Sequence, residues 1–180
     1  MIITTSTLTE AQPFIDFFDL KPVQKRPFPI YEKPPFTLIV TGIGPLRASA
    51  ALSHILTKKA EPVMNFGISA GKKVGKIYNI YKVIDAHSHK SYILKRSNIF
   101  ENAVLKSYAT PVSTKQNCLV DMEGAALAGC VKLYGQDIEI VKLVSDAFTP
   151  DTVDMQNIAE LIKKKIKPIL DTIASKKGLQ

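Results

Sequence analysis

The sequence predicts an α/β fold, in which a sheet is covered by helices on both faces. Short runs of β-branched and other apolar residues, typical of buried strands, recur along the chain. Between them lie segments whose apolar residues follow helical spacing, and this alternation favours the α/β class. The length of 180 residues corresponds to about one domain, and the chain shows neither a linker nor an internal repeat. We therefore expect residues 1–180 to form a single domain.

The N-terminal part of the chain is predicted to contain a strand, a helix and a second strand. Residues 1–6 combine isoleucine with threonine, which favours a short buried strand. Thr7-x-x-Glu10 has the pattern of a capping box and predicts that a helix begins there. Prolines recur through residues 22–35, so this stretch cannot be a helix, and we expect a loop with one edge strand. Residues 36–41 form an apolar run typical of a buried strand.

The middle of the chain continues the alternation. Gly42-Ile-Gly44-Pro45 interrupts the apolar run, and Pro45 suits the first turn of a helix that we expect at 46–57. Further strands are expected at 62–68, 77–84, 92–94 and 103–112.

The C-terminal third is predicted to contain two helices around a strand. A helix is expected at 123–134, where Gly135 can end it. An apolar strand at 138–144 and a long amphipathic helix at 154–174 follow. Sheets of this class bind ligands at the carboxyl ends of their strands, so we expect the functional site there.

The charge and composition exclude several classes of protein. The net charge of +8 comes from 24 basic and 16 acidic residues, but only three of the basic residues are arginine, the side chain best suited to bidentate phosphate contacts. We therefore predict no nucleic-acid partner. No apolar run of 18 residues and no signal-peptide pattern occurs, which argues against a membrane partner or secretion. Two cysteines are too few for a disulfide framework, and we expect a cytoplasmic protein.

Acidic residues follow several of the predicted strands. Glu10 can be a capping-box residue or a site carboxylate, and Asp146 can cap a turn or act as a general acid. Asp121-Met-Glu-Gly-Ala-Ala126 places two acids before a helix, where they can stabilise its N-terminus or border a ligand. Gly42-x-Gly44 lacks the third glycine of a dinucleotide-binding motif. Asn65-Phe-Gly-Ile-Ser-Ala-Gly71 suits either a tight turn or a close approach to a ligand.

The sequence offers no convincing metal site. His87 and His89 would share one face of a strand, but no third ligand stands at a recognised spacing, so we interpret both as surface residues. Cys118 and Cys130 are interpreted as ordinary thiols. We predict neither a metal nor a cofactor. Motifs of serine hydrolases, P-loop NTPases and zinc proteases are missing from the sequence.

The order of these segments resembles the purine nucleoside phosphorylase and nucleosidase superfamily. The resemblance rests on the following segments: Glu10, Thr41-Gly-Ile-Gly44, Asn65–Gly71, Val74-Gly-Lys-Ile77, Asp121–Ala126 and Val144-Ser-Asp146. It is closest to the hydrolytic branch, which includes 5′-methylthioadenosine/S-adenosylhomocysteine nucleosidase and futalosine hydrolase. The resemblance implies a three-layer α/β/α fold with a central mixed, twisted sheet.

The resemblance also implies roles for individual residues. Asp146 would donate a proton to N7 of the purine, with Ser145 orienting it. Glu10 would position the attacking water, and Glu123 would bind the ribose hydroxyls. The remaining substrate-binding residues implied are Met122 against the sugar, Ser69, Ala70 and Gly71 beside the base, and Ile43. The aromatic residue that stacks on the base in this family is not found in Pro111–Gln116.

The expected activity is hydrolysis of the N-glycosidic bond of a 5′-modified adenosine-type nucleoside. Phosphorolysis is the alternative, but phosphorylases hold phosphate with arginines, and Lys72 and Lys73 follow Gly71 instead. Glu10 would also repel phosphate. A third hypothesis is a relative that binds nucleosides without cleaving them, although binding alone does not need an acid at the base. The resemblance further implies a homodimer with a small-molecule nucleoside substrate.

Overall fold

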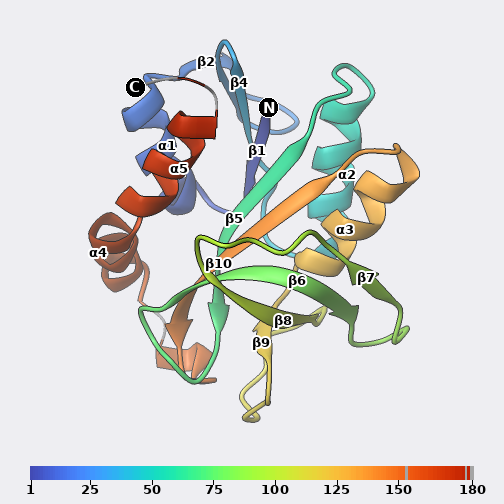
Figure 1. The fold of residues 1–180 in the computed structure, drawn as a ribbon, viewed down its shortest axis with the longest axis vertical. Coiled ribbons are helices and arrows are strands. Elements are labelled where there is room, and N and C mark those ends of the chain that lie inside the picture. Colours follow the sequence, from blue (N-terminus) through green and yellow to red (C-terminus); the bar gives the residue numbers. More distant parts are fainter. Residues whose placement is uncertain (153, 177, 179–180) are drawn as a thin grey trace.

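The protein folds into one mixed sheet with helices packed against both of its faces (Figure 1). A computed structural model describes residues 1–152, 154–176 and 178. The strands are β1 (Ile2–Thr5), β2 (Lys21–Gln24), β3 (Ile30–Lys33), β4 (Phe36–Val40), β5 (Val63–Ala70), β6 (Ile77–Asp85), β7 (Ser91–Ile93), β8 (Glu101–Ser107), β9 (Leu119–Asp121) and β10 (Ile138–Asp146). The α-helices are α1 (Leu8–Phe18), α2 (Pro45–Leu56), α3 (Gly124–Leu133), α4 (Met155–Lys165) and α5 (Lys167–Lys176). None of these helices is long and apolar enough to cross a membrane.

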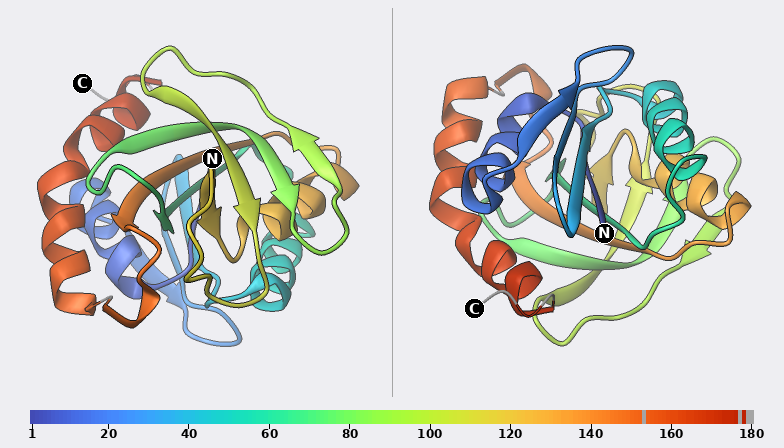
Figure 2. Two further views of the ribbon diagram at one scale, coloured as in Figure 1. Left: turned by 90° about the horizontal axis from the view of Figure 1, so that it is seen from below. Right: turned by 90° about the horizontal axis from the view of Figure 1, so that it is seen from above.

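The sheet is parallel at its centre and closes on itself at one end. Strands β4, β1, β5 and β10 pair in parallel, and β3 and β2 extend the β4 edge in antiparallel orientation. Beyond β10 the sheet continues through β6, β8 and β9, and β9 pairs with β5. Five strands therefore form a closed ring, and the long bend of β6 and β10 that closure requires is visible in Figure 2.

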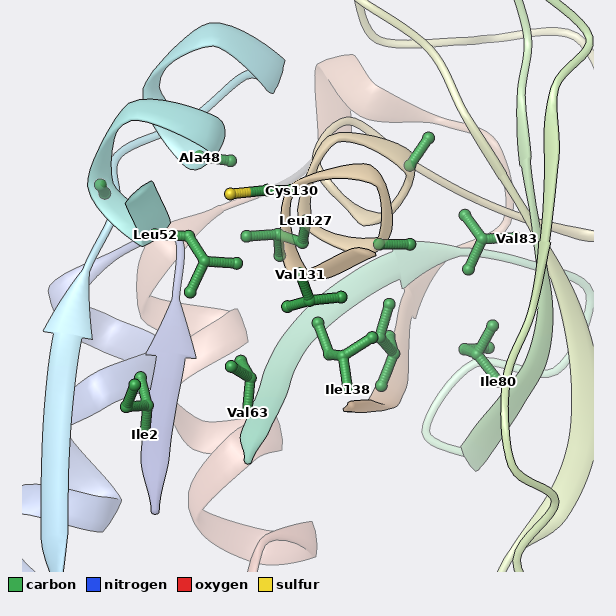
Figure 3. Packing of buried hydrophobic residues seen from close by; sticks show 14 of the residues in the cluster. Ile2, Ala48, Leu52, Val63, Ile80, Val83, Leu127, Cys130, Val131 and Ile138 are labelled. Atoms are coloured by element: carbon green, nitrogen blue, oxygen red, sulfur yellow. The ribbon is translucent and has the colours of Figure 1, made fainter. Parts of the chain in front are cut away.

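Two hydrophobic cores, one on each face of the sheet, hold the helices in place. Neighbouring residues of β1 illustrate the division, because Ile2 packs toward α2 and α3, whereas Ile3 packs toward α1, α4 and α5. Figure 3 shows the first core, in which Leu52 of α2 and Leu127 of α3 meet Val63 of β5. Strands buried on both faces explain why they appear in the sequence as continuous apolar runs. The mixed sheet with helices on both faces agrees with the sequence prediction.

Several element boundaries differ from the prediction. The proline-rich stretch forms two edge strands, β2 and β3, where one was expected. The short strand β9 was not predicted, and β8 ends at Ser107, not near residue 112. The predicted long helix at 154–174 is wrong, because it is divided into α4 and α5 at Ile166. Pro168 explains the break, since proline lacks the N–H that a continuous helix would need there and its ring clashes with the carbonyl group four residues earlier.

Candidate functional site

A cavity of about 260 Å³ lies at the carboxyl ends of β1, β5, β9 and β10. Eight of the nine site residues nominated from the sequence line it: Glu10, Ile43, Ser69, Ala70, Met122, Glu123, Ser145 and Asp146. The ninth, Gly71, lies behind the wall, where its N–H donates to the Asp146 carbonyl oxygen at 2.9 Å. The convergence follows from the topology, because the parallel strands β1, β5 and β10 end at the same edge of the sheet, where the antiparallel strand β9 pairs with the last residue of β5.

Glu10 serves both as a helix cap and as a wall of the cavity. Its backbone N–H donates to Thr7 Oγ1, and its own Oε2 accepts from Thr7 N at 2.8 Å, which completes the capping box. Oε2 also accepts from Ser6 N at 2.9 Å, while Oε1 accepts from Ile68 N at 3.0 Å. These N–H donors fix the orientation of the Glu10 carboxyl group. Oε1, with a single such bond, has the freer lone pairs toward a ligand.

Glu123, a second carboxylate of the cavity wall, is held by the turn before α2. Its Oε1 accepts a hydrogen bond from Gly44 N at 2.6 Å. Gly44 has a φ of +98°, a region that side-chain-bearing residues rarely adopt, so glycine is needed to aim this N–H. The Gly42-x-Gly44 turn therefore binds a carboxylate of the protein itself, and leaves the other oxygen of Glu123 for a ligand.

A buried ion pair lies directly behind these carboxylates. Lys142 of β10 and Asp121 of β9 are both almost fully buried, with 2.9 Å between Lys142 Nζ and Asp121 Oδ2. Asp121 also accepts from Gly124 N at 2.9 Å and from Ser107 Oγ at 2.6 Å. Ser107 Oγ in turn accepts from Ala125 N at 2.9 Å. The pair thus joins β8, β9, β10 and the first turn of α3.

Gly67 makes room for the lysine. It is the register partner of Lys142 in the parallel pairing of β5 with β10, so both residues face the same side of the sheet. A Cβ atom at Gly67 would lie 2.9 Å from Lys142 Nζ and 3.4 Å from Glu10 Oε1. The missing side chain therefore allows the ammonium group to approach Glu10 as well as Asp121.

The charges of this cluster determine its protonation. Burial alone would lower the pKa of Lys142, but Asp121, Glu123 and Glu10 together raise it above its ordinary value. Burial and then the negative charge of Asp121 raise the pKa of Glu123 to about 7, against the opposing effects of Lys142 and the Gly44 N–H. An unfolded glutamate releases its proton near 4.5. Between these two pH values the folded protein keeps a proton that the unfolded chain has released. The contribution of Glu123 to the free energy of unfolding therefore falls as the pH rises from 4.5 to about 7.

Asp146 lies at the end of β10, where the β5 pairing shifts register. It is half-buried; its Oδ1 accepts from Thr149 N and its Oδ2 from Ser145 Oγ, both at 2.9 Å. Ser145 Oγ also lies 3.2 Å from the Ser69 carbonyl oxygen. The buried hydroxyl of Ser69 has no hydrogen-bond partner among the described residues, so it is available to a ligand.

Sequence reasoning missed several residues of the site. Lys142 was treated only as part of a strand, although a lone charge in an apolar run was a signal that it needed a buried partner. Asp121 was interpreted through the helix that follows it, because β9 was not predicted. The cavity is also lined by residues that were not nominated: Thr110, Pro111, Val112, Met155 and Ile158. The segment 110–112 lines the cavity without an aromatic side chain.

The histidines lie away from this cavity. His87 is in the turn after β6 and His89 follows it, both exposed, so the strand face on which they would have met does not exist. Among the described residues, no three His, Cys, Asp or Glu side chains gather as a metal site requires.

Comparison with solved structures shows that the chain has a known fold. No family model and no curated protein matches the chain. Solved structures do match. The 5′-methylthioadenosine/S-adenosylhomocysteine nucleosidase of Neisseria meningitidis, in complex with methylthio-immucillin-A, has a TM-score of 0.83 at 17% identity, covering 97% of this chain and 98% of that chain.

Two further structures give the same result. The Colwellia psychrerythraea 34H nucleosidase with adenine has a TM-score of 0.78 at 15% identity, covering 94% of this chain and 92% of its own. A Chlamydia trachomatis nucleosidase variant bound to methylthioadenosine has a TM-score of 0.77 at 20% identity, covering 97% of each chain. The chain therefore has the fold of these nucleosidases, a mixed sheet with helices, in agreement with the resemblance found in the sequence.

We predict that Lys142→Met lowers the free energy of unfolding by about 3–5 kcal/mol, because it leaves buried carboxylates without their cation. The loss should be smaller at pH 5 than at pH 8, since Glu123, whose pKa is raised to about 7, is protonated at pH 5 and leaves one fewer unpaired charge. Urea denaturation at both pH values measures it. Lys176→Met, which removes an exposed pair with Glu139, is the matched control and should cost about 0–1 kcal/mol.

A double variant tests whether the loss of stability in Lys142→Met comes from unpaired charge or from lost packing. Adding Asp121→Asn to Lys142→Met should recover part of the lost stability, because one buried negative charge is removed. Equal losses for Lys142→Met and Lys176→Met, or no dependence on pH, would contradict the charge cluster.

Proposed function

We propose that the protein is a purine nucleosidase that hydrolyses the N-glycosidic bond of a 5′-modified adenosine-type nucleoside, of the methylthioadenosine, S-adenosylhomocysteine or futalosine kind. The observation that carries the proposal is that Glu10, Glu123 and Asp146, which come from distant parts of the chain, line one cavity. The fold supports it, because the similar structures are nucleosidases, among them complexes with adenine and with methylthioadenosine.

Asp146 is assigned to the base. When the glycosidic bond breaks, its electron pair moves onto the purine, and a proton delivered to N7 neutralises the leaving group. Ser145 Oγ, 2.9 Å from Asp146 Oδ2, fixes the orientation of this carboxyl group. The aliphatic segment 110–112 and the backbone near Ala70 would border the planar base. General acid catalysis of this kind contributes about 10²–10⁴-fold to the rate.

Glu123 and Met122 are assigned to the sugar. One oxygen of Glu123 is occupied by Gly44 N, and the other can accept hydrogen bonds from ribose hydroxyls. The ionised form is required for this task, and its negative charge also stabilises the positive charge that develops on the sugar. Burial of Glu123 strengthens that interaction by excluding water.

Glu10 is assigned to the attacking water. Its carboxylate is fixed by Ser6 N, Thr7 N and Ile68 N, so the acceptor oxygen stays in place without the sugar bound. Glu10 can accept a proton from water as the water oxygen bonds to C1′ of the sugar. The buried hydroxyl of Ser69, which has no hydrogen-bond partner among the described residues, offers a further hydrogen bond to the water.

The lining of the cavity favours water over phosphate as the nucleophile. No arginine or lysine appears among the described residues that line it. Lys142 is fully buried behind the wall against Asp121, and Arg47 lies with its side chain across Gly42. Phosphate in the cavity would therefore meet the Glu10 carboxylate without an exposed cation to bind it, which disfavours phosphorolysis.

We predict that the wild-type protein releases free adenine from methylthioadenosine at a rate independent of added phosphate, and that Asp146→Asn slows release by about 10²–10⁴-fold. The amide keeps the size of the side chain but carries no acidic proton. Adenine release is measured by chromatography, with circular dichroism to verify folding, and Asp171→Asn on the exposed face of α5 is the matched control.

Each other outcome overturns a particular element of the proposal. Release that requires phosphate selects a phosphorylase, and near-normal turnover by Asp146→Asn removes the assigned acid. Tight binding of methylthioadenosine without any release selects a nucleoside-binding protein.

We also propose that the protein is a cytoplasmic homodimer. The cytoplasmic assignment is supported by the low number of cysteines, and the dimer by exposed apolar residues beside the cavity. Ile43, in the turn before α2, is 59% exposed, and Leu46, in the first turn of α2, is 81% exposed, which suits an interface better than free solvent. Sedimentation velocity should show a dimer that Leu46→Glu dissociates; a monomeric wild type would overturn the dimer.

A further inference from the structure

The first turn of α3 is capped by residues from outside the helix. Glu123 is the N-cap residue, but its side chain makes no capping hydrogen bond, although N-cap side chains ordinarily accept from an N–H two or three residues later. Here Ser107 Oγ accepts from Ala125 N at 2.9 Å. Asp121 Oδ2 accepts from Gly124 N, also at 2.9 Å. The last residues of β8 and β9 therefore satisfy two N–H groups that the helix cannot satisfy by itself.

This arrangement leaves the Glu123 side chain free for the cavity. Its carboxylate lines the cavity assigned to the nucleoside and accepts from Gly44 N at 2.6 Å. Without Ser107 Oγ, the N–H of Ala125 would have no acceptor in a buried turn, which is costly. The carboxylate of the N-cap residue could then take that place, as N-cap side chains ordinarily do. Glu123 would in that case turn away from the sugar.

Ser107 is itself fixed in place by Asp121. The two residues are register partners at the ends of the parallel strands β8 and β9, and Ser107 Oγ donates to Asp121 Oδ1 at 2.6 Å. Both side chains are buried. A hydroxyl can donate and accept through the same oxygen, so Ser107 joins the Asp121 carboxylate to the N–H of Ala125.

The missing side chain of Gly124 allows α3 to begin this close to β8. A Cβ atom there would lie 2.6 Å from Leu105 Cδ2, 3.0 Å from Asp121 Oδ2 and 3.2 Å from Ser107 Oγ. Any side chain would therefore push the start of the helix away from the strand ends. Glu123 directly precedes this glycine, so its backbone position is determined by the same contacts.

We propose that Ser107 is a positioning residue for the sugar-binding carboxylate: it caps α3 in place of Glu123, so that Glu123 stays directed at the ribose hydroxyls. Ser107 does not appear among the described residues that line the nucleoside cavity, so we assign its effect to Glu123. The inference rests on the proposed function and adds a residue that determines the preference for a ribose with free hydroxyls.

The test compares methylthioadenosine with its analogue that lacks the 2′ and 3′ hydroxyls. We expect Ser107→Ala to lower kcat/KM for methylthioadenosine about tenfold, as the loss of a hydrogen bond to a charged group implies. The value for the analogue should fall less than about threefold, because only its charge interaction with Glu123 remains to be changed. Loss of folded protein lowers both values equally, so the ratio of the two values reports on the position of Glu123.

A double variant shows whether Ser107 acts through Glu123. In a Glu123→Ala background, Ser107→Ala should leave the ratio of the two kcat/KM values unchanged, because no carboxylate is left to position. Ser97→Ala is the matched control, since it removes a serine hydroxyl that accepts from Ile99 N at 3.1 Å away from the cavity wall. It should change neither value. If circular dichroism shows Ser107→Ala to be unfolded, Ser107→Cys carries the same comparison, because a thiol is only a weak donor and acceptor.

The outcomes separate this inference from the proposed function. Equal losses on both substrates, no loss on either, or a changed ratio that persists in the Glu123→Ala background would overturn the role of Ser107 and leave the nucleosidase proposal intact. A wild-type protein that releases adenine from neither compound overturns the proposed function, and the role of Ser107 with it.

Discussion

The buried ion pair between Lys142 and Asp121 is the constraint on which the rest of the site depends. It places one almost fully buried ammonium group next to three carboxylates, those of Asp121, Glu123 and Glu10. Buried charges are tolerated only when they are paired and hydrogen-bonded. Lys142 pairs with Asp121, and Asp121 accepts from the backbone N–H of Gly124. Gly67, which has no side chain, leaves the space that the lysine occupies. Backbone N–H groups fix the orientation of Glu10 and Glu123, and the ammonium group of Lys142 supplies the positive charge next to them.

The closed ring of strands explains how such a cluster can be built from distant segments. Pairing of β9 with both β8 and β5 brings Asp121 to the strand that carries Gly67, and β10 supplies Lys142 from the neighbouring position. Binding groups held at strand ends and first helical turns are positioned by the whole sheet, and not by a flexible loop. This rigidity suits a reaction that depends on carboxylates placed before the substrate arrives.

Features that depend on a short stretch of sequence could be predicted, whereas features that depend on contacts between distant segments could not. Glu10 and Asp146 could be nominated because each follows an apolar strand, and the structure shows that Glu10 is both a cap and a cavity residue. The Lys142–Asp121 pair could not be located, since it depends on a three-residue strand whose partners lie far along the chain. The break at Pro168 was predictable from the proline alone and was overlooked. The roles of the cavity residues stay predictions.

The charge cluster around Lys142 is tested most directly by nuclear magnetic resonance of glutamate side-chain carboxyl carbons as the pH is varied. Glu123, assigned by its loss in Glu123→Gln, should titrate with a midpoint of about 7. A midpoint near the ordinary glutamate value of about 4.3 would contradict the account, because it would mean that Glu123 is neither buried nor beside Asp121 in solution.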